Sequence, residues 1–108
     1  MKLLLKGIGV SQGTAEGIAK VLIPGQKITN LPKDCVLVTT ITDPTMINLM
    51  LQARAIITDM GGMTSHPAII AREMGVPCVV GTKTATKIVT DGIKIFVDGT
   101  KGEIYELD

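Results

Sequence analysis

The stretch AIITDMGGMTSHPAIIAREMGVPCVVG, residues 55–81, predicts a strand, a turn, a helix and a second strand in that order. Residues 55–59 open with a short apolar run that is typical of a buried strand. The run HPAIIAREMG predicts a helix, because Pro67 suits a first helical turn and Gly75 is a natural C-terminal cap. Residues 77–81 predict the next strand. A strand, helix and strand in succession indicate that the two strands pair in parallel.

Similar patterns continue on both sides of this stretch. We expect strands or extended segments over residues 2–10, 16–23 and 34–40, helices over 44–53 and 84–89, and a terminal hairpin from 93–97 and 103–107. The middle of the chain alternates strands and helices, whereas both ends are rich in strands. The sequence therefore predicts a mixed α/β domain with a second β layer.

The helix expected over residues 44–53 has clear local signals. Thr42 or Asp43 can cap it, and Pro44 suits its first position. Its apolar residues recur at helical spacing: Met46, Leu49, Met50 and Ala53. We therefore expect an amphipathic helix that packs on the sheet.

Length and composition indicate one domain, residues 1–108. Nearly half of the 108 residues are apolar, which suffices for one modest core. The only aromatic residues are Phe96 and Tyr105, so we expect a core of aliphatic side chains. The sequence has no GxxxxGK[ST] run and is too short for a TIM barrel or an ATP-grasp domain.

Charge, the N-terminal segment and cysteine usage indicate the cellular compartment and the classes of partner. The net charge is +1, which gives no strong field toward nucleic acid or a membrane surface. The opening MKLLLKG has too short an apolar run for a signal peptide or a spanning helix, so we expect a cytoplasmic protein. Cys35 and Cys78 form no CxxC pair, and we expect two buried, reduced thiols.

His66, the only histidine, follows two glycines and two hydroxyl residues. Gly61 and Gly62 allow backbone N–H groups to approach a ligand closely. Thr64 and Ser65 offer hydroxyl groups. The positive end of the helix dipole disfavours imidazolium and favours a bound anion, so a neutral imidazole there can attack phosphorus. These residues predict a phosphoryl-carrying histidine.

Other interpretations of these residues remain open. A lone histidine near a helix start is often a cap or a buried hydrogen-bonding group. A metal site lacks partners at ligand spacing, and a Ser65–His66 nucleophile pair lacks a carboxylate to orient the ring. Arg72 fits either a contact to a phosphate or partner domain, or, with Glu73, a solvent-facing charge pair with the neighbouring loop.

The run GGMTSHPAIIAREMGVPCVVG resembles the signature of the mobile phosphohistidine domain of PEP-utilising enzymes, GG-x-T-[S/C]-H-A-A-I-x-A-R-E-x-G-x-P-x-V-V-G. Three flanking segments are similar to other parts of that domain: GIGVSQGTAEGIAKVL, DCVLVTTITDPTMINLMLQARAIITD and TDGIKIFVDGTKGEIYEL. The resemblance covers essentially the whole chain. One departure is Pro67, where the family usually has alanine; proline removes one backbone N–H that could hold a phosphate.

The resemblance implies a three-layer β/β/α swivelling domain and a phosphoryl intermediate on His66. Gly61, Gly62, Thr64, Ser65 and Arg72 would support the phosphate. The resemblance also implies partner domains: an ATP-grasp domain for the nucleotide and a TIM-barrel domain that holds PEP or pyruvate with Mg²⁺. We expect no cofactor on this chain itself. Thr64 matches a threonine that regulatory kinases phosphorylate in some family members.

Two other functions remain open. Some pyruvate kinases carry a similar extra C-terminal domain with a structural or regulatory role, in which the histidine is not used. Small subunits of some dehydratases borrow the swivelling fold without phosphohistidine, although the intact GG-x-T-S-H run disfavours that alternative. The principal prediction is a phosphoryl carrier that resembles the mobile domain of PEP synthase and pyruvate phosphate dikinase.

Overall fold

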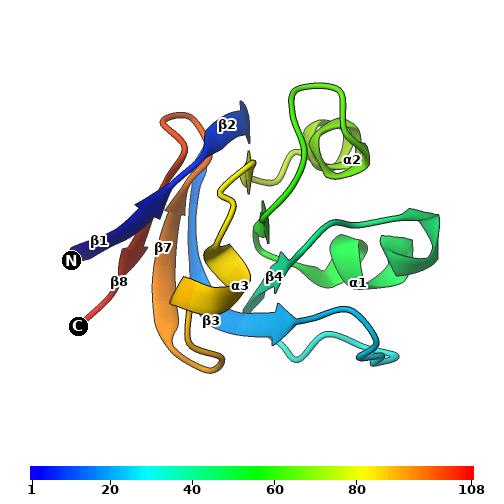
Figure 1. Cartoon of the computed structure of the whole chain (residues 1–108), viewed down its shortest axis with the longest axis horizontal. Coiled ribbons are helices and arrows are strands. Elements are labelled where there is room, and N and C mark those ends of the chain that lie inside the picture. The colour runs from blue at the N-terminus through cyan, green and yellow to red at the C-terminus, as the bar shows by residue number, and fades with distance from the viewer.

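The computed structural model describes residues 1–108 and contains eight strands and three α-helices (Figure 1). The elements are β1 (Lys2–Lys6), β2 (Ile8–Ser11), β3 (Thr14–Leu22), β4 (Cys35–Thr39), a 3₁₀ turn (Pro44–Met46), α1 (Ile47–Gln52), β5 (Ile56–Thr58), α2 (His66–Met74), β6 (Cys78–Val80), α3 (Ala85–Ile88), β7 (Lys94–Asp98) and β8 (Glu103–Glu106). No helix is long and apolar enough to span a bilayer.

One eight-stranded sheet runs in the order β1-β8-β7-β3-β4-β5-β6-β2. Its central pairs β3–β4, β4–β5 and β5–β6 are parallel, and the remaining pairs are antiparallel. The parallel pairs β4–β5 and β5–β6 are joined through α1 and α2, because parallel neighbours need a crossover connection. The mixed α/β fold with parallel central strands is confirmed.

The central strands are buried on both faces, which produces three layers. In β4, Leu37 faces a core with Met50 of α1 and Ala68 of α2, whereas Val38 faces a second core. The second core also holds Ile95 and side chains of β8, because the sheet curls until its β1-β8-β7 part covers its β4-β5-β6 part. Figure 1 shows β1, β7 and β8 on one side of β4, and α1 and α2 on the other. The predicted second β layer is part of the same continuous sheet.

The expected extended segment 2–10 is divided into two strands. β1 pairs with β8 and β2 pairs with β6, at opposite ends of the sheet order. Gly7 separates them and donates its N–H to the Gly102 carbonyl at 2.8 Å. The chain therefore links both edges of the curled sheet through one residue, and the segment expected to be extended supplies a strand to each edge.

Glycines form the corner where β2 crosses the β7–β8 turn. A Cβ on Gly9 would collide with the Gly99 carbonyl, and a Cβ on Gly99 would collide with the Ser11 carbonyl. A Cβ on Gly102 would strike the Gly7 carbonyl. The backbones approach so closely here that only hydrogen fits at these positions.

The helices lie at the predicted positions, but the first of them begins as a 3₁₀ turn. Asp43 accepts the Thr45 N–H at 2.8 Å and caps a 3₁₀ turn that precedes α1. The helix expected over 44–53 is thus a 3₁₀ turn followed by a short α-helix. Gly75 ends α2 in the left-handed conformation, with φ of 73°.

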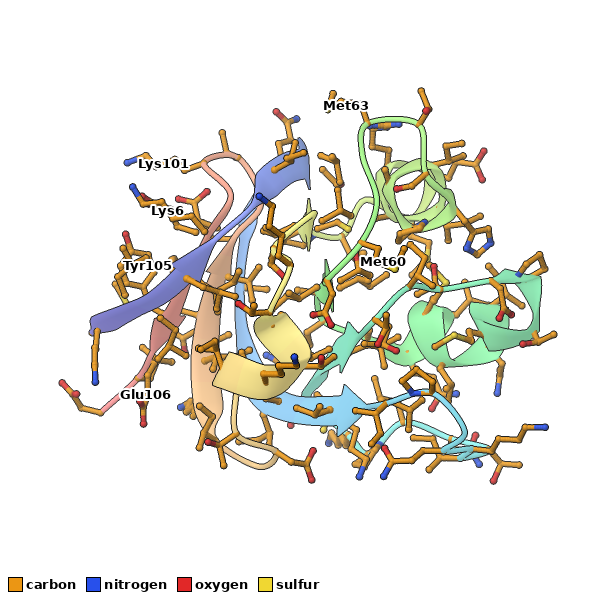
Figure 2. The ribbon with its side chains drawn as sticks, in the orientation of Figure 1. Lys6, Met60, Met63, Lys101, Tyr105 and Glu106 are labelled. Carbon is orange, nitrogen blue, oxygen red and sulfur yellow. The ribbon has the colours of Figure 1, made fainter.

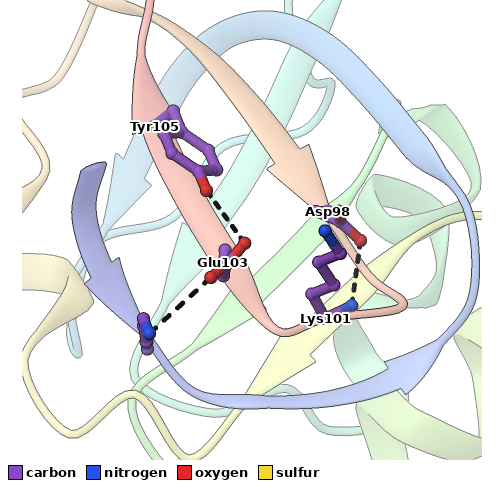
Figure 3. A network of polar contacts seen from close by, with 5 residues as sticks. Asp98, Lys101, Glu103 and Tyr105 are labelled. Carbon is purple, nitrogen blue, oxygen red and sulfur yellow. Dashed lines mark hydrogen bonds and ion pairs between the residues drawn. The ribbon is translucent and has the colours of Figure 1, made fainter. Parts of the chain in front are cut away.

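The terminal hairpin is confirmed, and it holds both aromatic residues. Phe96 and Tyr105 are cross-strand partners on the outer face of the sheet, with ring centroids 6.1 Å apart. Figure 3 shows the Tyr105 hydroxyl donating to Glu103 at 2.8 Å, and that hydrogen bond raises the pKa of Tyr105. The same carboxylate forms an ion pair with the Lys6 ammonium group at 3.7 Å. The buried core is aliphatic, as expected, and both cysteines are buried and free.

Candidate functional site

His66 is the first residue of α2 and is half-buried. The connection of residues 59–65 brings the chain to it from the end of β5. Its ring nitrogen Nδ1 lies 2.9 Å from the hydroxyl oxygen of Thr42. Thr42 is only 3% exposed and lies between β4 and the 3₁₀ turn, so its hydroxyl is a fixed partner. The imidazole is therefore held at one nitrogen by a buried side chain.

This contact determines what the other ring nitrogen can do. In a neutral imidazole one nitrogen carries the proton and the other carries a lone pair. When Nδ1–H donates to the Thr42 oxygen, Nε2 keeps its lone pair and is the nucleophilic atom. Because His66 is not fully buried, an incoming group can approach the ring.

The glycine segment before His66 is open. Gly61 has a φ of +118°, which favours glycine, and a Cβ there would lie 2.8 Å from the Ser65 hydroxyl oxygen. Gly62 has nothing within 4 Å of an added Cβ. Thr64 is exposed. A ligand can therefore come close to the backbone at Gly62 without displacing a side chain.

Ser65 occupies the N-cap position of α2, but its side chain does not cap the helix. Its hydroxyl donates to the Gly62 carbonyl at 2.7 Å, and its N–H donates to the same oxygen at 3.1 Å. These bonds close a tight turn over residues 62–65. The oxygen lone pairs of Ser65 stay available, whereas its proton is used within the turn.

Arg72 binds two backbone carbonyl groups. One guanidinium nitrogen donates to Val10 of β2 at 3.1 Å, and the other donates to Met63 at 2.5 Å. Arg72 also lines a cleft of about 520 Å³ beside Gly9, Gly75 and Gly99, and His66 is absent from that lining. Arg72 thus contacts the neighbouring loop through the Met63 carbonyl, and it takes part in no ion pair.

One carboxylate near the imidazole was not anticipated from the sequence. Hydrogen bonds from the Thr45 hydroxyl and N–H hold the pKa of Asp43 below its usual value, and Asp43 lies close enough to His66 for a protonated ring to lower that pKa further. Asp43 directly follows Thr42, so the segment that orients the ring also places an anion near it. No three His, Cys, Asp or Glu side chains come together as metal ligands.

Exposed apolar side chains occur in the loop before α2 and in the first turn of α2. Met60 and Met63 are each 57% exposed, and Ile69 is 44% exposed one turn after His66. Figure 2 shows Met63 at the outer end of the loop that leads into α2, with Met60 near the base of that loop. Exposed apolar side chains of this kind favour contact with another protein surface.

Residues 31–102 match the family model described as "PEP-utilising enzyme, mobile domain". Over 105 residues the chain is 52% identical to a probable phosphoenolpyruvate synthase of Archaeoglobus fulgidus and 47% identical to a phosphoenolpyruvate synthase of Pyrococcus furiosus. Both matches cover 97% of this chain, but only 14% and 13% of the respective relatives. The chain thus corresponds to a small part of much longer proteins.

Solved structures confirm the fold. An Enzyme I protein (nEIt) in solution superposes with a TM-score of 0.62 at 32% identity, over 70% of this chain and 32% of that one. Holo aconitase X of Thermococcus kodakaraensis gives a TM-score of 0.71 at 21% identity, over 96% of this chain and 98% of that one. The second likeness is one of fold alone.

Proposed function

This chain belongs to the family of PEP-utilising enzyme mobile domains, and we propose that it carries a phosphoryl group as a covalent adduct of His66. The observation that supports this most directly is the Thr42–His66 contact. It occupies Nδ1 and leaves Nε2 as the free nitrogen of a half-buried ring at the start of α2. A carrier needs one nitrogen fixed and one available.

The reaction proceeds in two transfers at Nε2. The Nε2 lone pair attacks phosphorus of the donor, and the bond from phosphorus to the donor's leaving oxygen breaks. The ring proton stays on Nδ1, which keeps donating it to the Thr42 hydroxyl oxygen. An acceptor oxygen on a second site then attacks the same phosphorus and releases the imidazole. Each step depends on a partner that places the donor or acceptor in line with Nε2.

The start of α2 supports the charged product. The N-terminal N–H groups of a helix and its dipole favour an anion, and Gly61 and Gly62 leave the backbone accessible. Thr64 offers an exposed hydroxyl, and Ser65 shapes the turn. Pro67 supplies no N–H, so fewer donors meet the phosphate here than in a chain with alanine at that position.

The names of the relatives support a role within a PEP synthase-like phosphotransferase. A cytoplasmic location remains the expectation from the sequence. This chain would move phosphate between a nucleotide site on an ATP-grasp domain and a PEP or pyruvate site on a TIM-barrel domain. Mg²⁺ would be held by those domains. A regulatory kinase could act on Thr64, which is exposed and lies two residues before His66.

The test is a phosphoryl-labelling experiment. The 108-residue chain is mixed with PEP or ATP, Mg²⁺ and the remaining domains of a PEP synthase, and its mass is measured. We expect a gain of one phosphate that is labile in acid and stable in base, and that is absent from His66→Ala. His66→Asn is the matched control that keeps a polar side chain beside Thr42. Absence of labelling with every competent donor would contradict the carrier role and favour a structural or regulatory module.

A further inference from the structure

The turn that precedes His66 has few connections to the rest of the domain. At its base, the Met60 N–H donates to the Thr40 carbonyl at 3.0 Å, and Thr58 donates to the Met60 carbonyl at 2.6 Å. From residue 61 to 64, the Gly62 carbonyl is bound only within the turn, by Ser65. The Met63 carbonyl is the one group of this tip that is hydrogen-bonded from outside the turn, and its donor is Arg72.

Arg72 connects the turn of residues 61–64 to both α2 and the sheet. Its side chain reaches back along α2 to the Met63 carbonyl, and its second guanidinium nitrogen donates to the Val10 carbonyl of β2. Val10 is 5% exposed and belongs to the core, so this anchor is rigid. A planar guanidinium can hold two acceptors at fixed relative positions, which a flexible ammonium group does not.

We propose that Arg72 is a positioning residue that fixes the glycine turn, residues 61–64, against β2, so that the turn is preformed before phosphate arrives. This inference rests on the proposed function, because the turn matters only if a phosphoryl group is carried there. Arg72 then acts through backbone carbonyl groups rather than by touching the phosphate. The role extends the predicted phosphate-supporting function of this residue and gives it a mechanism.

Such positioning affects the rate of phosphoryl transfer and leaves the chemical reactivity of the His66 imidazole unchanged. The turn contains flexible glycines, and displacement of reacting groups by about 1 Å can cost on the order of a hundred-fold in rate. Thr42 holds the ring independently of Arg72. Loss of Arg72 should therefore leave His66 chemically reactive but misplace the backbone that meets the phosphate.

The experiment compares Arg72→Gln and Arg72→Lys with the wild-type chain and with Arg54→Gln. Arg54 is a matched control because it too is exposed and binds a carbonyl, that of Glu16, together with the Asp34 carboxylate. Amide chemical shifts and hydrogen exchange of Gly61 and Gly62 are measured by NMR without phosphate. Labelling is measured with phosphoramidate, a small-molecule donor, and separately with PEP, Mg²⁺ and the remaining PEP synthase domains.

We expect Arg72→Gln to shift the Gly61 and Gly62 amides before any phosphate is present and to accelerate their exchange. Partner-dependent labelling should fall about ten- to hundred-fold, whereas phosphoramidate should still label His66 to full stoichiometry. Arg72→Lys should not restore the rate, and Arg54→Gln should match wild type.

Three results would overturn the positioning role. The first is an unchanged set of turn amides in Arg72→Gln, whatever the labelling shows. The second is wild-type labelling kinetics in Arg72→Gln, and the third is full rescue by Arg72→Lys, which would indicate a charge contact to phosphate. If the wild-type chain fails to take phosphate from any donor while the turn amides still respond to Arg72→Gln, the carrier function fails but the tie between Arg72 and the turn is supported.

Discussion

Thr42 and His66, separated by 24 residues in the sequence, meet through a hydroxyl oxygen and ring nitrogen 2.9 Å apart. The hydroxyl comes from the segment that follows β4, and the imidazole comes from the start of α2. The contact therefore depends on the parallel pairing of β4 and β5, which brings these two connections to the same edge of the sheet. It sets the orientation of the ring and decides which nitrogen is free.

Replacement of Thr42 by valine should slow phosphoryl transfer to His66 about five-fold, because one hydrogen bond of roughly 1 kcal/mol to the ring is lost. Valine has nearly the shape of threonine, so the buried position stays filled. The measurement is the rate of partner-dependent labelling. Thr42→Ser keeps the hydroxyl and should label at close to the wild-type rate; equal loss in both variants would show that packing, not the hydroxyl, matters.

Gly62→Ala should slow labelling without destabilising the domain. An added Cβ at Gly62 meets no atom within 4 Å, so the free energy of unfolding should stay within about 0.5 kcal/mol of wild type. The methyl group nevertheless occupies the open space through which a phosphate reaches the backbone. Thermal unfolding and labelling measured on the same sample separate the two effects. Wild-type labelling by this variant would place the phosphate elsewhere.

Gly99→Ala should instead destabilise the fold. Its Cβ would collide with the Ser11 carbonyl and approach the backbone of Cys78 at 2.9 Å, and neither strand can move away freely. We expect a loss of about 1–3 kcal/mol in the free energy of unfolding, or failure to fold. Urea denaturation tests this, with Gly62→Ala as the tolerated glycine replacement. Equal stability of the two variants would contradict the close approach of β2 to the β7–β8 turn.

Local signals were sufficient to predict most of the fold. The strand, helix and strand of residues 55–81 are each bounded by their own glycine or proline residues, so their limits do not depend on distant partners. The division of residues 2–10 depends on pairing with two strands from other parts of the chain, β8 and β6. The sequence of this segment has uniform strand character, and nothing local marks Gly7 as the point of separation.

The same reasoning explains which parts of the site were predicted. His66, Gly61 and Gly62 lie in one continuous motif and were identified together. Thr42 was considered only as a helix cap, because its contact to the ring arises from the packing of two separate connections. The partners of Arg72 are backbone carbonyl groups, which leave no pattern in the sequence.

Stability should fall with rising pH because of Cys78. Burial raises the pKa of its thiol to about 12 in the folded chain, from an ordinary value of 9.0. Between these values the unfolded chain loses the proton while the folded chain keeps it, so stability is full below pH 9 and declines above it. By pH 10.5 the free energy of unfolding should have fallen by about 2 kcal/mol relative to its value below pH 9. Urea denaturation at pH 8 and 10.5 checks this against Cys78→Ala, whose pH dependence should be smaller by that amount.

Pro67→Ala tests the departure of this chain from the family signature. Alanine adds one N–H at the start of α2, where the dipole and unpaired donors favour an anion, so we expect phosphohistidine to hydrolyse more slowly. The unfolded chain gains freedom when proline is lost, which should lower the free energy of unfolding by about 0.4–1 kcal/mol. The lifetime of labelled His66 in neutral buffer and the melting temperature are measured together. A longer lifetime in a less stable domain is the expected combination, whereas an unchanged lifetime would show that the phosphate does not use the N–H groups of this turn.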